Sequence, residues 1–180
     1  MRDVLVAAVI AEAEEVSSRV KMQKMIYLLQ RMGFDFGFHD FSLRDFGPFS
    51  AELASTIDAI PAGMVIENKV EGTGAQGQTI VQYSYRVDPA ASSLLRSSLH
   101  THFRARSSQL RELARELSDR RTRVLEVAAT AVYLRDEVGA RDETQLWQEV
   151  EHRKGQWRQH FEEARNLLAE WDRRGILRRA

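Results

Sequence analysis

Apolar residues recur at three- and four-residue steps in two runs between residues 20 and 60, with a phenylalanine-rich loop between the runs. The first run consists of Met22, Met25, Ile26, Leu29 and Met32. This spacing places the side chains on one face of a helix, which Ser17 or Ser18 can cap. Gly33 follows, and it predicts the end of the helix because glycine adopts a left-handed conformation without a Cβ penalty.

The second run predicts another helix. It consists of Phe49, Leu53, Ile57 and Ile60. Gly47-Pro48 precedes the run and Pro61 follows it. Proline suits the first position of a helix because its missing N–H would have had no partner there. We therefore predict a helix with Gly47 as its cap and Pro48 as its first residue, ending before Pro61.

The N-terminal residues predict a helix before these two. Asp3 can cap it by accepting a hydrogen bond from a free N–H of the first turn. Apolar residues from Val4 onward form one side of this helix, which we expect to run to about Val16.

After residue 63 the periodicity changes from 3.6 to 2. Apolar and polar residues alternate over 64–71 and 81–87, and the glycine-rich segment 72–77 between them predicts a turn. Two such strands around a turn make a β-hairpin. Three helices followed by a hairpin is the order of elements in a winged helix. We therefore predict a winged-helix-like core over residues 1–88.

The second half of the chain begins with a long predicted helix. Asp88-Pro89 is a strong helix start, and an apolar stripe continues to Leu117. A helix of this length would span about 40 Å. Two interpretations stay open. The helix bends or breaks near Ser107-Ser108 and packs on the core, or it is a dimerisation or partner-binding helix.

Three more helices follow. The segment Thr122–Val138 is apolar on most sides, which is typical of a central buried helix. Asp142 and Gln145 resemble a capping box for a short helix. The last helix carries Trp157 on its apolar face and can end at Gly175. The predicted fold class is α+β and mostly helical, with the winged-helix-like core and a helical C-terminal half, residues 89–180, packed together as one domain.

Composition excludes several classes of protein. The 180 residues include no cysteine, so disulfides, thiol catalysis and Cys-ligated zinc are excluded. The apolar run Val4–Ala11 is far shorter than the ~20 residues that span a bilayer. It also lacks the basic flank of a signal peptide. These features predict a cytoplasmic protein without a membrane segment.

The formal net charge is zero, which argues against a general nucleic-acid binder. The charge is uneven, because residues 1–90 carry 8 basic and 12 acidic side chains while residues 91–180 carry 18 and 14. The second half therefore offers a basic face to an acidic partner, or the two halves attract each other weakly.

Direct DNA reading is disfavoured by the third predicted helix. In a winged helix this element enters the major groove, where Arg, Lys, Asn and Gln make the specific contacts. Here it carries Glu52 and Asp58 and no basic residue, so phosphates would repel it. Lys21, Lys24, Arg31 and Arg44 either form a secondary basic patch or are ordinary solvated charges on helix surfaces. DNA stays a possible partner, and a DNA-binding transcriptional regulator is the alternative function.

No residue pattern predicts a reaction, a cofactor or a metal. His100 and His102 lie two apart on a helix and point away from each other, and the chain has no HExxH motif. It has no GxSxG motif, and segment 72–77 lacks the Lys-Ser/Thr of a phosphate-binding loop. We therefore predict a non-enzymatic protein with no catalytic, cofactor-binding or metal-binding residues.

We call residues 34–49 the aromatic crossing. Its phenylalanines are Phe34, Phe36, Phe38, Phe41, Phe46 and Phe49. They either fill one layer of the core, or one or two of them stay exposed as anchors for a protein partner, because large aromatics dominate interface energies. The predicted partner surface combines Phe38, Phe41, Arg44, Phe49, Glu52 and Asp58 with the basic face of the C-terminal half.

The phrase KMQKMIYLLQRMGF, followed by FGFHDFSLRDFGPFSAEL, resembles the signature of the Panacea antitoxin domain and its YwgA-like and SocA-like relatives. Segment VLEVAATAVYLRDE and the helices after it resemble the second half of that family. Phe46-Gly47-Pro48 stands where the relatives commonly have Tyr-Gly-Pro. The residues that match the family motif are Lys21, Gln23, Lys24, Gly47 and Pro48.

The resemblance implies a winged-helix-like core and a mostly structural role for the motif residues. It also implies a non-enzymatic role, either neutralising a toxin by direct binding or acting as an adaptor or regulator in phage- and mobile-element-associated systems. We therefore expect a protein-binding module, an antitoxin, whose partner is a toxin or a regulator.

Overall fold

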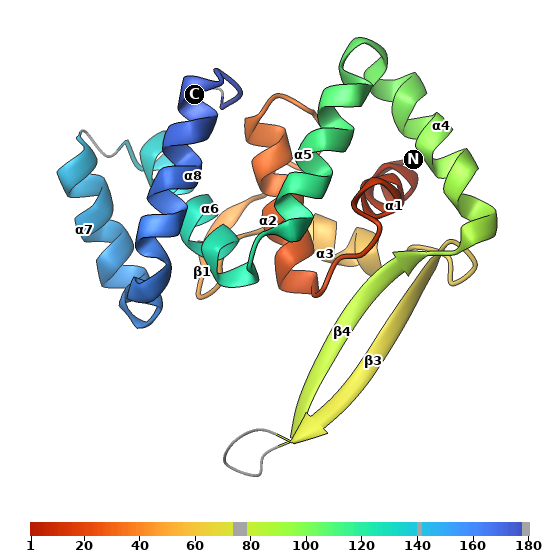
Figure 1. Cartoon of the computed structure of the whole chain (residues 1–180), viewed down its shortest axis with the longest axis horizontal. Coiled ribbons are helices and arrows are strands. Elements are labelled where there is room, and N and C mark those ends of the chain that lie inside the picture. Colours follow the sequence, from red (N-terminus) through yellow and green to blue (C-terminus); the bar gives the residue numbers. More distant parts are fainter. Residues whose placement is uncertain (74–78, 140–141, 178–180) are drawn as a thin grey trace.

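The structure is a computed structural model that describes residues 1–73, 79–139 and 142–177. The fold is α+β and mostly helical, with two small antiparallel hairpins in the described residues (Figure 1). The helices are α1 (Arg2–Ala13), α2 (Arg19–Arg31), α3 (Ala51–Asp58), α4 (Pro89–Phe103), α5 (Ser107–Asp119), α6 (Thr122–Glu137), α7 (Glu143–Lys154) and α8 (Phe161–Arg173), with 3-10 helices η1 (Arg104–Arg106) and η2 (Gly155–His160). The first hairpin consists of β1 (Ser42–Arg44) and β2 (Gly47–Phe49), and the second of β3 (Val65–Thr73) and β4 (Thr79–Val87).

The boundaries predicted for α1 were wrong at both ends. Asp3 does not cap the helix, because the helix already begins at Arg2; instead its Oδ1 accepts a hydrogen bond from the N-terminal ammonium at 2.7 Å. The helix ends at Ala13 rather than near Val16. Glu14 has a φ of 65°, in the left-handed region that does not continue a right-handed helix.

Helix α2 begins and ends at the residues that were predicted from the sequence. The Ser18 hydroxyl accepts a hydrogen bond from the N–H of Lys21 at 3.0 Å, which confirms the predicted cap. Gly33 has a φ of 86° and follows the last turn, which confirms the predicted stop. Arg106 completes this end by donating to the carbonyls of Met32 and Gly33 at 2.9 and 3.0 Å.

The start predicted for the third helix was wrong. Gly47 and Pro48 belong to β2 and not to a helix. Helix α3 begins at Ala51, and Ser50 caps it by accepting a hydrogen bond from the N–H of Leu53 at 2.9 Å. Strands of three residues are too short to show the alternation by which strands are predicted, so the first hairpin left no clear pattern in the sequence.

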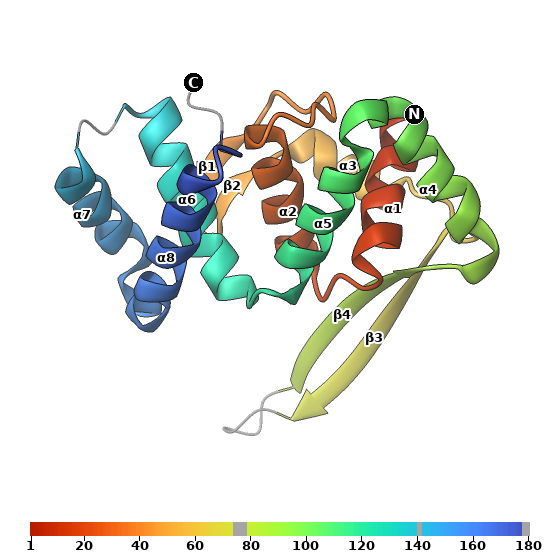
Figure 2. The ribbon, with the colours of Figure 1, turned by 45° about the horizontal axis from the view of Figure 1, so that its top comes forward.

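Strands β3 and β4 confirm the predicted hairpin. Gly72 and Thr73 of the predicted turn belong to β3, and the rest of that turn, residues 74–77, lies outside the described residues. Val16 exchanges two backbone hydrogen bonds with Tyr85 of β4, at 3.0 and 2.9 Å. Away from this bridge the hairpin projects from the helical body (Figures 1 and 2).

The long helix predicted over residues 89–117 is broken. Helix α5 begins at Ser107 after η1, which confirms the predicted bend near Ser107-Ser108. Both α4 and α5 pack against α1. Their buried residues include Leu95, Leu99, Leu110, Leu113 and Leu117. The interpretation as a single dimerisation or partner-binding helix is therefore contradicted in its helix, which is broken and packs its apolar stripe on α1.

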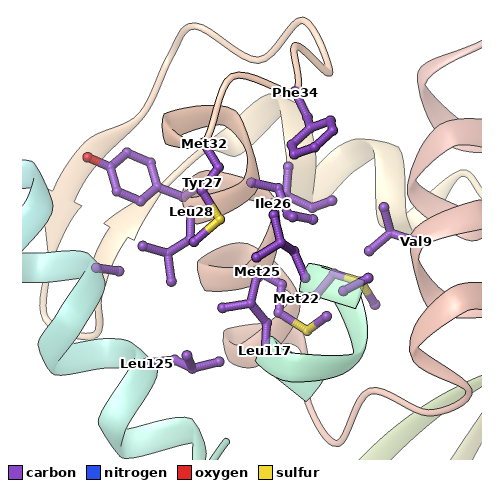
Figure 3. Packing of buried hydrophobic residues seen from close by; sticks show 14 of the residues in the cluster. Val9, Met22, Met25, Ile26, Tyr27, Leu28, Met32, Phe34, Leu117 and Leu125 are labelled. Carbon is purple, nitrogen blue, oxygen red and sulfur yellow. The ribbon is translucent and has the colours of Figure 1, made fainter. Parts of the chain in front are cut away.

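Helix α6 is central, as predicted. It contacts α2, α7, α8 and β2, and its apolar residues such as Val127 are fully buried. Figure 3 shows the neighbouring core, where Met25 of α2 lies near Leu117 of α5 and Leu125 of α6. One hydrophobic cluster includes residues from both halves of the chain.

The C-terminal caps also follow the sequence. Asp142 accepts a hydrogen bond from the N–H of Gln145 at 2.8 Å, which confirms the cap predicted for α7. Gly175 has a φ of 61°, and the next residue, Ile176, is buried and donates its N–H back to α8 at 3.1 Å. Trp157 was wrongly placed on the last helix, because it lies in η2 before α8 begins.

Candidate functional site at the first hairpin

Glutamines of α2 hold the aromatic crossing through its backbone. Gln30 donates to the carbonyl of Phe38 at 2.7 Å and accepts a hydrogen bond from the Phe38 N–H at 3.1 Å. Gln23 makes the same pair of bonds with Ser50, at 2.9 and 3.0 Å. Each glutamine thus acts as a strand neighbour would, and it satisfies backbone groups that water cannot reach.

Two buried lysines hold the first hairpin. Lys24 of α2 donates from Nζ to the carbonyl of Pro48 at 2.6 Å, and Lys154 of α7 donates to the carbonyl of Asp45. Both lysines are only 1% exposed. An isolated two-stranded hairpin is marginally stable at best. Contacts from two different helices therefore fix this hairpin in place.

Gly47 lets β2 lie directly against α6. Its φ is 90°, and a Cβ at this position would lie 2.8 Å from the hydroxyl of Thr130 and 3.4 Å from the carbonyl of Glu126. Both neighbours belong to the buried face of α6. The close approach requires a residue without a side chain.

Glu126 supplies the buried negative charge beside the lysines. Its Oε1 accepts a hydrogen bond from Arg123 at 2.6 Å, and its Oε2 has no hydrogen-bond partner among the described residues. Burial raises the pKa of Glu126 even though Arg123, Lys154 and Lys24 oppose the shift. Burial lowers the pKa of Lys24 to about 7, against the attraction of Glu126, and burial also lowers the pKa of Lys154. Because Lys24 is enclosed and bonded to a carbonyl, we assign it to holding the hairpin.

The turn of the first hairpin faces solvent. Phe46 lies in this turn and is 53% exposed. Beside it, the Arg44 guanidinium lies 4.6 Å from the centre of the Phe49 ring, a cation–π contact. A neighbouring groove of about 300 Å³ is lined by Leu43, Arg44, Asp45, Thr130, His152, Arg153 and Lys154. We call Phe46, Arg44, Phe49 and this groove the turn surface. It joins an exposed aromatic to side chains from the basic C-terminal half.

Some phenylalanines of the aromatic crossing fill the core and another is exposed, so the two interpretations apply to different residues. Phe34, Phe36 and Phe38 are buried in the core, whereas Phe46 is exposed. Phe38 is only 1% exposed, so its predicted role in partner binding was wrong. Its backbone is held by α2, and this turns the ring inward. Phe41 is half-buried.

The other predicted partner residues are divided between two places. Arg44 and Phe49 lie on the turn surface. Glu52 is exposed and forms an ion pair with Arg2 at 2.8 Å. Asp58 is exposed and forms an ion pair with Arg19 at 2.5 Å. Both acidic residues of α3 thus face arginines of this chain.

The predicted basic patch was wrong at three of its four residues, whereas Arg44 lies exposed on the turn surface. Lys21 and Lys24 are buried, and Lys21 donates to the carbonyl of Ser118 at the end of α5. Arg31 binds Asp136 at 2.7 Å and Glu137 at 3.2 Å. Backbone carbonyls and α6 carboxylates hold these charges, so they do not face a partner.

Four of the five motif residues meet in one place. Gln23 and Lys24 bind the segment from Pro48 to Ser50, and Gly47 adjoins them. Lys21 lies apart, against the end of α5.

Sequence reasoning missed two charged members of this site. Glu126 could have been noticed, because it is a carboxylate within the apolar run of α6, and such a group needs a buried partner. Lys154 had no such signal, since it ends a helix rich in charge.

Within residues 1–73, 79–139 and 142–177, no group of three or more His, Asp or Glu side chains could hold a metal ion. In the same residues, no helix has the length and apolar character needed to cross a lipid bilayer.

Comparison with protein-family models and with curated proteins found no match to this chain. The family resemblance therefore stays a prediction.

Proposed function

We propose that this protein is a non-enzymatic protein-binding module, an antitoxin that neutralises a partner toxin by binding it directly through the turn surface. The observation that carries the proposal is the exposed Phe46 on a hairpin fixed by Lys24 and Lys154. An aromatic side chain on a rigid turn loses little conformational freedom on binding, and aromatic anchors dominate interface energies.

The groove beside Phe46 suggests the chemistry of the partner. Arg44, His152 and Arg153 line it, with Asp45 as the one acidic residue among its described lining. In the part of the chain that the structure describes, Arg153 makes a single long ion pair, to Glu149 at 3.9 Å, and nearly half of each side chain is exposed. Such positive charges favour a partner with acidic side chains next to the pocket that receives Phe46.

We further propose that the core is of the winged-helix type. Helices α1, α2 and α3 and the second hairpin follow that order. Val16, between α1 and α2, adds a strand position next to Tyr85 of β4. In such a fold α3 would read DNA, but it carries no basic residue and its exposed carboxylates pair with Arg2 and Arg19. This supports a protein partner over a nucleic acid.

Co-expression with the product of an adjacent gene tests the proposal. We expect the wild-type chain to restore growth to cells that make this product and to copurify with it. Phe46→Ala is expected to abolish the rescue and to weaken the complex about 30-fold, as loss of a ~2 kcal/mol anchor does. Calorimetric titration of the purified pair measures this change.

Leu94→Ala is the matched control, because Leu94 is 65% exposed on α4, outside the turn surface. It is expected to bind and to protect as the wild type does. Failure to protect against any neighbouring gene product would overturn the antitoxin proposal. Unchanged binding by Phe46→Ala would remove the turn surface from the interface. A specific shift of upstream DNA near physiological salt would favour the transcriptional regulator instead.

A further inference from the structure

The outer edge of β3 is open. Among the described residues β3 pairs with β4 alone, whereas the far edge of β4 is bridged by Val16 at Tyr85. In both views β3 lies on the side of the hairpin away from the helices (Figures 1 and 2). The strand is nine residues long. An edge of this length presents backbone N–H and C=O groups to which another strand can bind.

The register shows which residues direct these groups outward. Tyr85 uses both its N–H and its C=O on Val16, so its pairing with Glu67 of β3 is a non-hydrogen-bonded pair. Hydrogen-bonded and non-hydrogen-bonded pairs alternate along an antiparallel ladder. The odd-numbered residues of β3 therefore direct their N–H and C=O to the open edge, and the even-numbered residues bond to β4.

The sequence around Asn68 is self-complementary. Glu67 and Lys69 flank it, and Ile66 and Val70 flank these in turn. Two antiparallel β3 strands centred on Asn68 would therefore place Glu67 opposite Lys69 and Ile66 opposite Val70, each of them twice.

Backbone geometry fits the same register. Glu67 and Lys69 both direct their backbone groups outward, so they would form hydrogen-bonded pairs across the new ladder. Ile66 and Val70 would form non-hydrogen-bonded pairs, in which side chains approach more closely. These two residues are 41% and 61% exposed, so the pairing would remove apolar surface from water.

We propose that β3 is a homodimerisation edge, on which a second copy of this chain adds its own β3 about a two-fold axis at Asn68. The two hairpins then form one four-stranded sheet. Because the same patch is used on both copies, the contact is isologous. This interface goes beyond the proposed antitoxin function and does not use the turn surface.

Neighbouring registers fit less well. Centring the pair on Lys69 would oppose Lys69 to itself and Glu67 to Glu71, and like charges directly opposite destabilise a sheet. Centring it on Val70 would oppose Lys69 to Glu71 but would leave Val70 as the only aliphatic match.

Charge reversal in the full chain tests the dimer and its register together. Sedimentation of the wild type through the micromolar range is expected to show a dimer. Lys69→Glu opposes two carboxylates at each ion-pair position, and Glu67→Lys opposes two ammonium groups. Each variant alone is expected to raise the dimer dissociation constant about tenfold or more. An equimolar mixture of the two restores opposite charges at every position and is expected to form a heterodimer.

Arg173→Glu makes the same charge change on α8, outside the turn surface and outside the hairpin, and is expected to remain dimeric. Circular dichroism of each variant checks that the hairpin still folds. Glu67→Lys also removes the acceptor of the hydrogen bond that the Tyr85 hydroxyl donates to Glu67. Recovery of a dimer on mixing shows that the hairpin of this variant can still pair. A wild type that is monomeric throughout would overturn the proposal and leave the edge to a strand of a different protein. So would a dimer that survives Lys69→Glu, or a mixture that stays monomeric.

Discussion

Replacing Gly47 with valine is expected to destabilise the fold by about 3 kcal/mol and to lower the melting temperature by about 10 °C. The φ of 90° disfavours any L-residue, and the new Cβ would meet the Thr130 hydroxyl at 2.8 Å. Thr130 cannot move away freely, because it is fully buried and donates to the Glu126 carbonyl at 2.7 Å. The effect comes from packing of β2 on α6 and not from a helix cap.

Gly63→Val is the matched control for thermal denaturation. An ideal Cβ on Gly63 has no atom within 4 Å, and its φ lies outside the left-handed region. The expected change is within about 0.5 kcal/mol. Adding Thr130→Ala to Gly47→Val is expected to restore part of the loss, since it removes the contacted hydroxyl. Equal melting temperatures for the Gly47 and Gly63 variants would contradict the close approach of β2 to α6.

The features that could be predicted from the sequence are those set by neighbouring residues. Ser18, Gly33, Asp142 and Gly175 each act within one turn of the helix that they begin or end, so their roles could be recognised without knowing the fold. The second hairpin was predicted for the same reason, because alternation over seven or eight residues is a local pattern.

Burial of the α2 lysines could not be predicted in this way. Lysine is almost never fully buried unless it is paired, so Lys21 and Lys24 were assigned to a solvated face. The groups that receive them are carbonyls of Ser118 and Pro48, distant in sequence. Only the packing of α5 and of the first hairpin against α2 brings these acceptors into reach.

The exposed aromatic was hard to choose for a related reason. Six phenylalanines share the aromatic crossing, and nothing in their spacing separates Phe38 from Phe46. The difference arises because Gln30 binds the Phe38 backbone while Phe46 lies in a two-residue turn. Gly47 and Pro48 of β2 were predicted to begin a helix, so the turn that precedes them was not predicted.

Replacing Glu126 with leucine is expected to cost about 2 kcal/mol at neutral pH, because Arg123 loses its acceptor and the buried Lys24 and Lys154 lose the countercharge that favours their protonated forms. Arg123 is partly exposed and stacks on Trp157 at 4.0 Å, so water and the ring can still stabilise it. Urea denaturation of the purified chain measures the loss.

A double-mutant cycle separates this charge effect from simple loss of packing. Lys24→Met is expected to cost about 1–3 kcal/mol less in the Glu126→Leu chain than in the wild type, because the lysine is then a buried charge without a countercharge. Glu162→Leu on α8 is the control for the substitution itself, since Glu162 is exposed, and it should change stability by no more than about 0.5 kcal/mol. Strictly additive losses would show that Lys24 and Glu126 do not interact.

The deficit in stability of Glu126→Leu should narrow as the pH rises. Lys24 has a pKa of about 7 in the folded chain against 10.5 for an ordinary lysine. Between these values the unfolded chain binds the extra proton, so the contribution of this group to stability rises with pH. Without Glu126 the pKa of Lys24 in the folded chain falls further. Rising pH therefore stabilises the variant more than the wild type, and the difference between their unfolding free energies narrows. In acid the folded wild type takes up the proton of Glu126 at a higher pH than the unfolded chain does, because the pKa of Glu126 is raised in the fold. Protonation of this carboxyl therefore stabilises the wild type, and because the variant lacks this gain, the deficit widens as the pH falls. A deficit that stays constant from acid to alkaline pH would contradict the buried charge cluster.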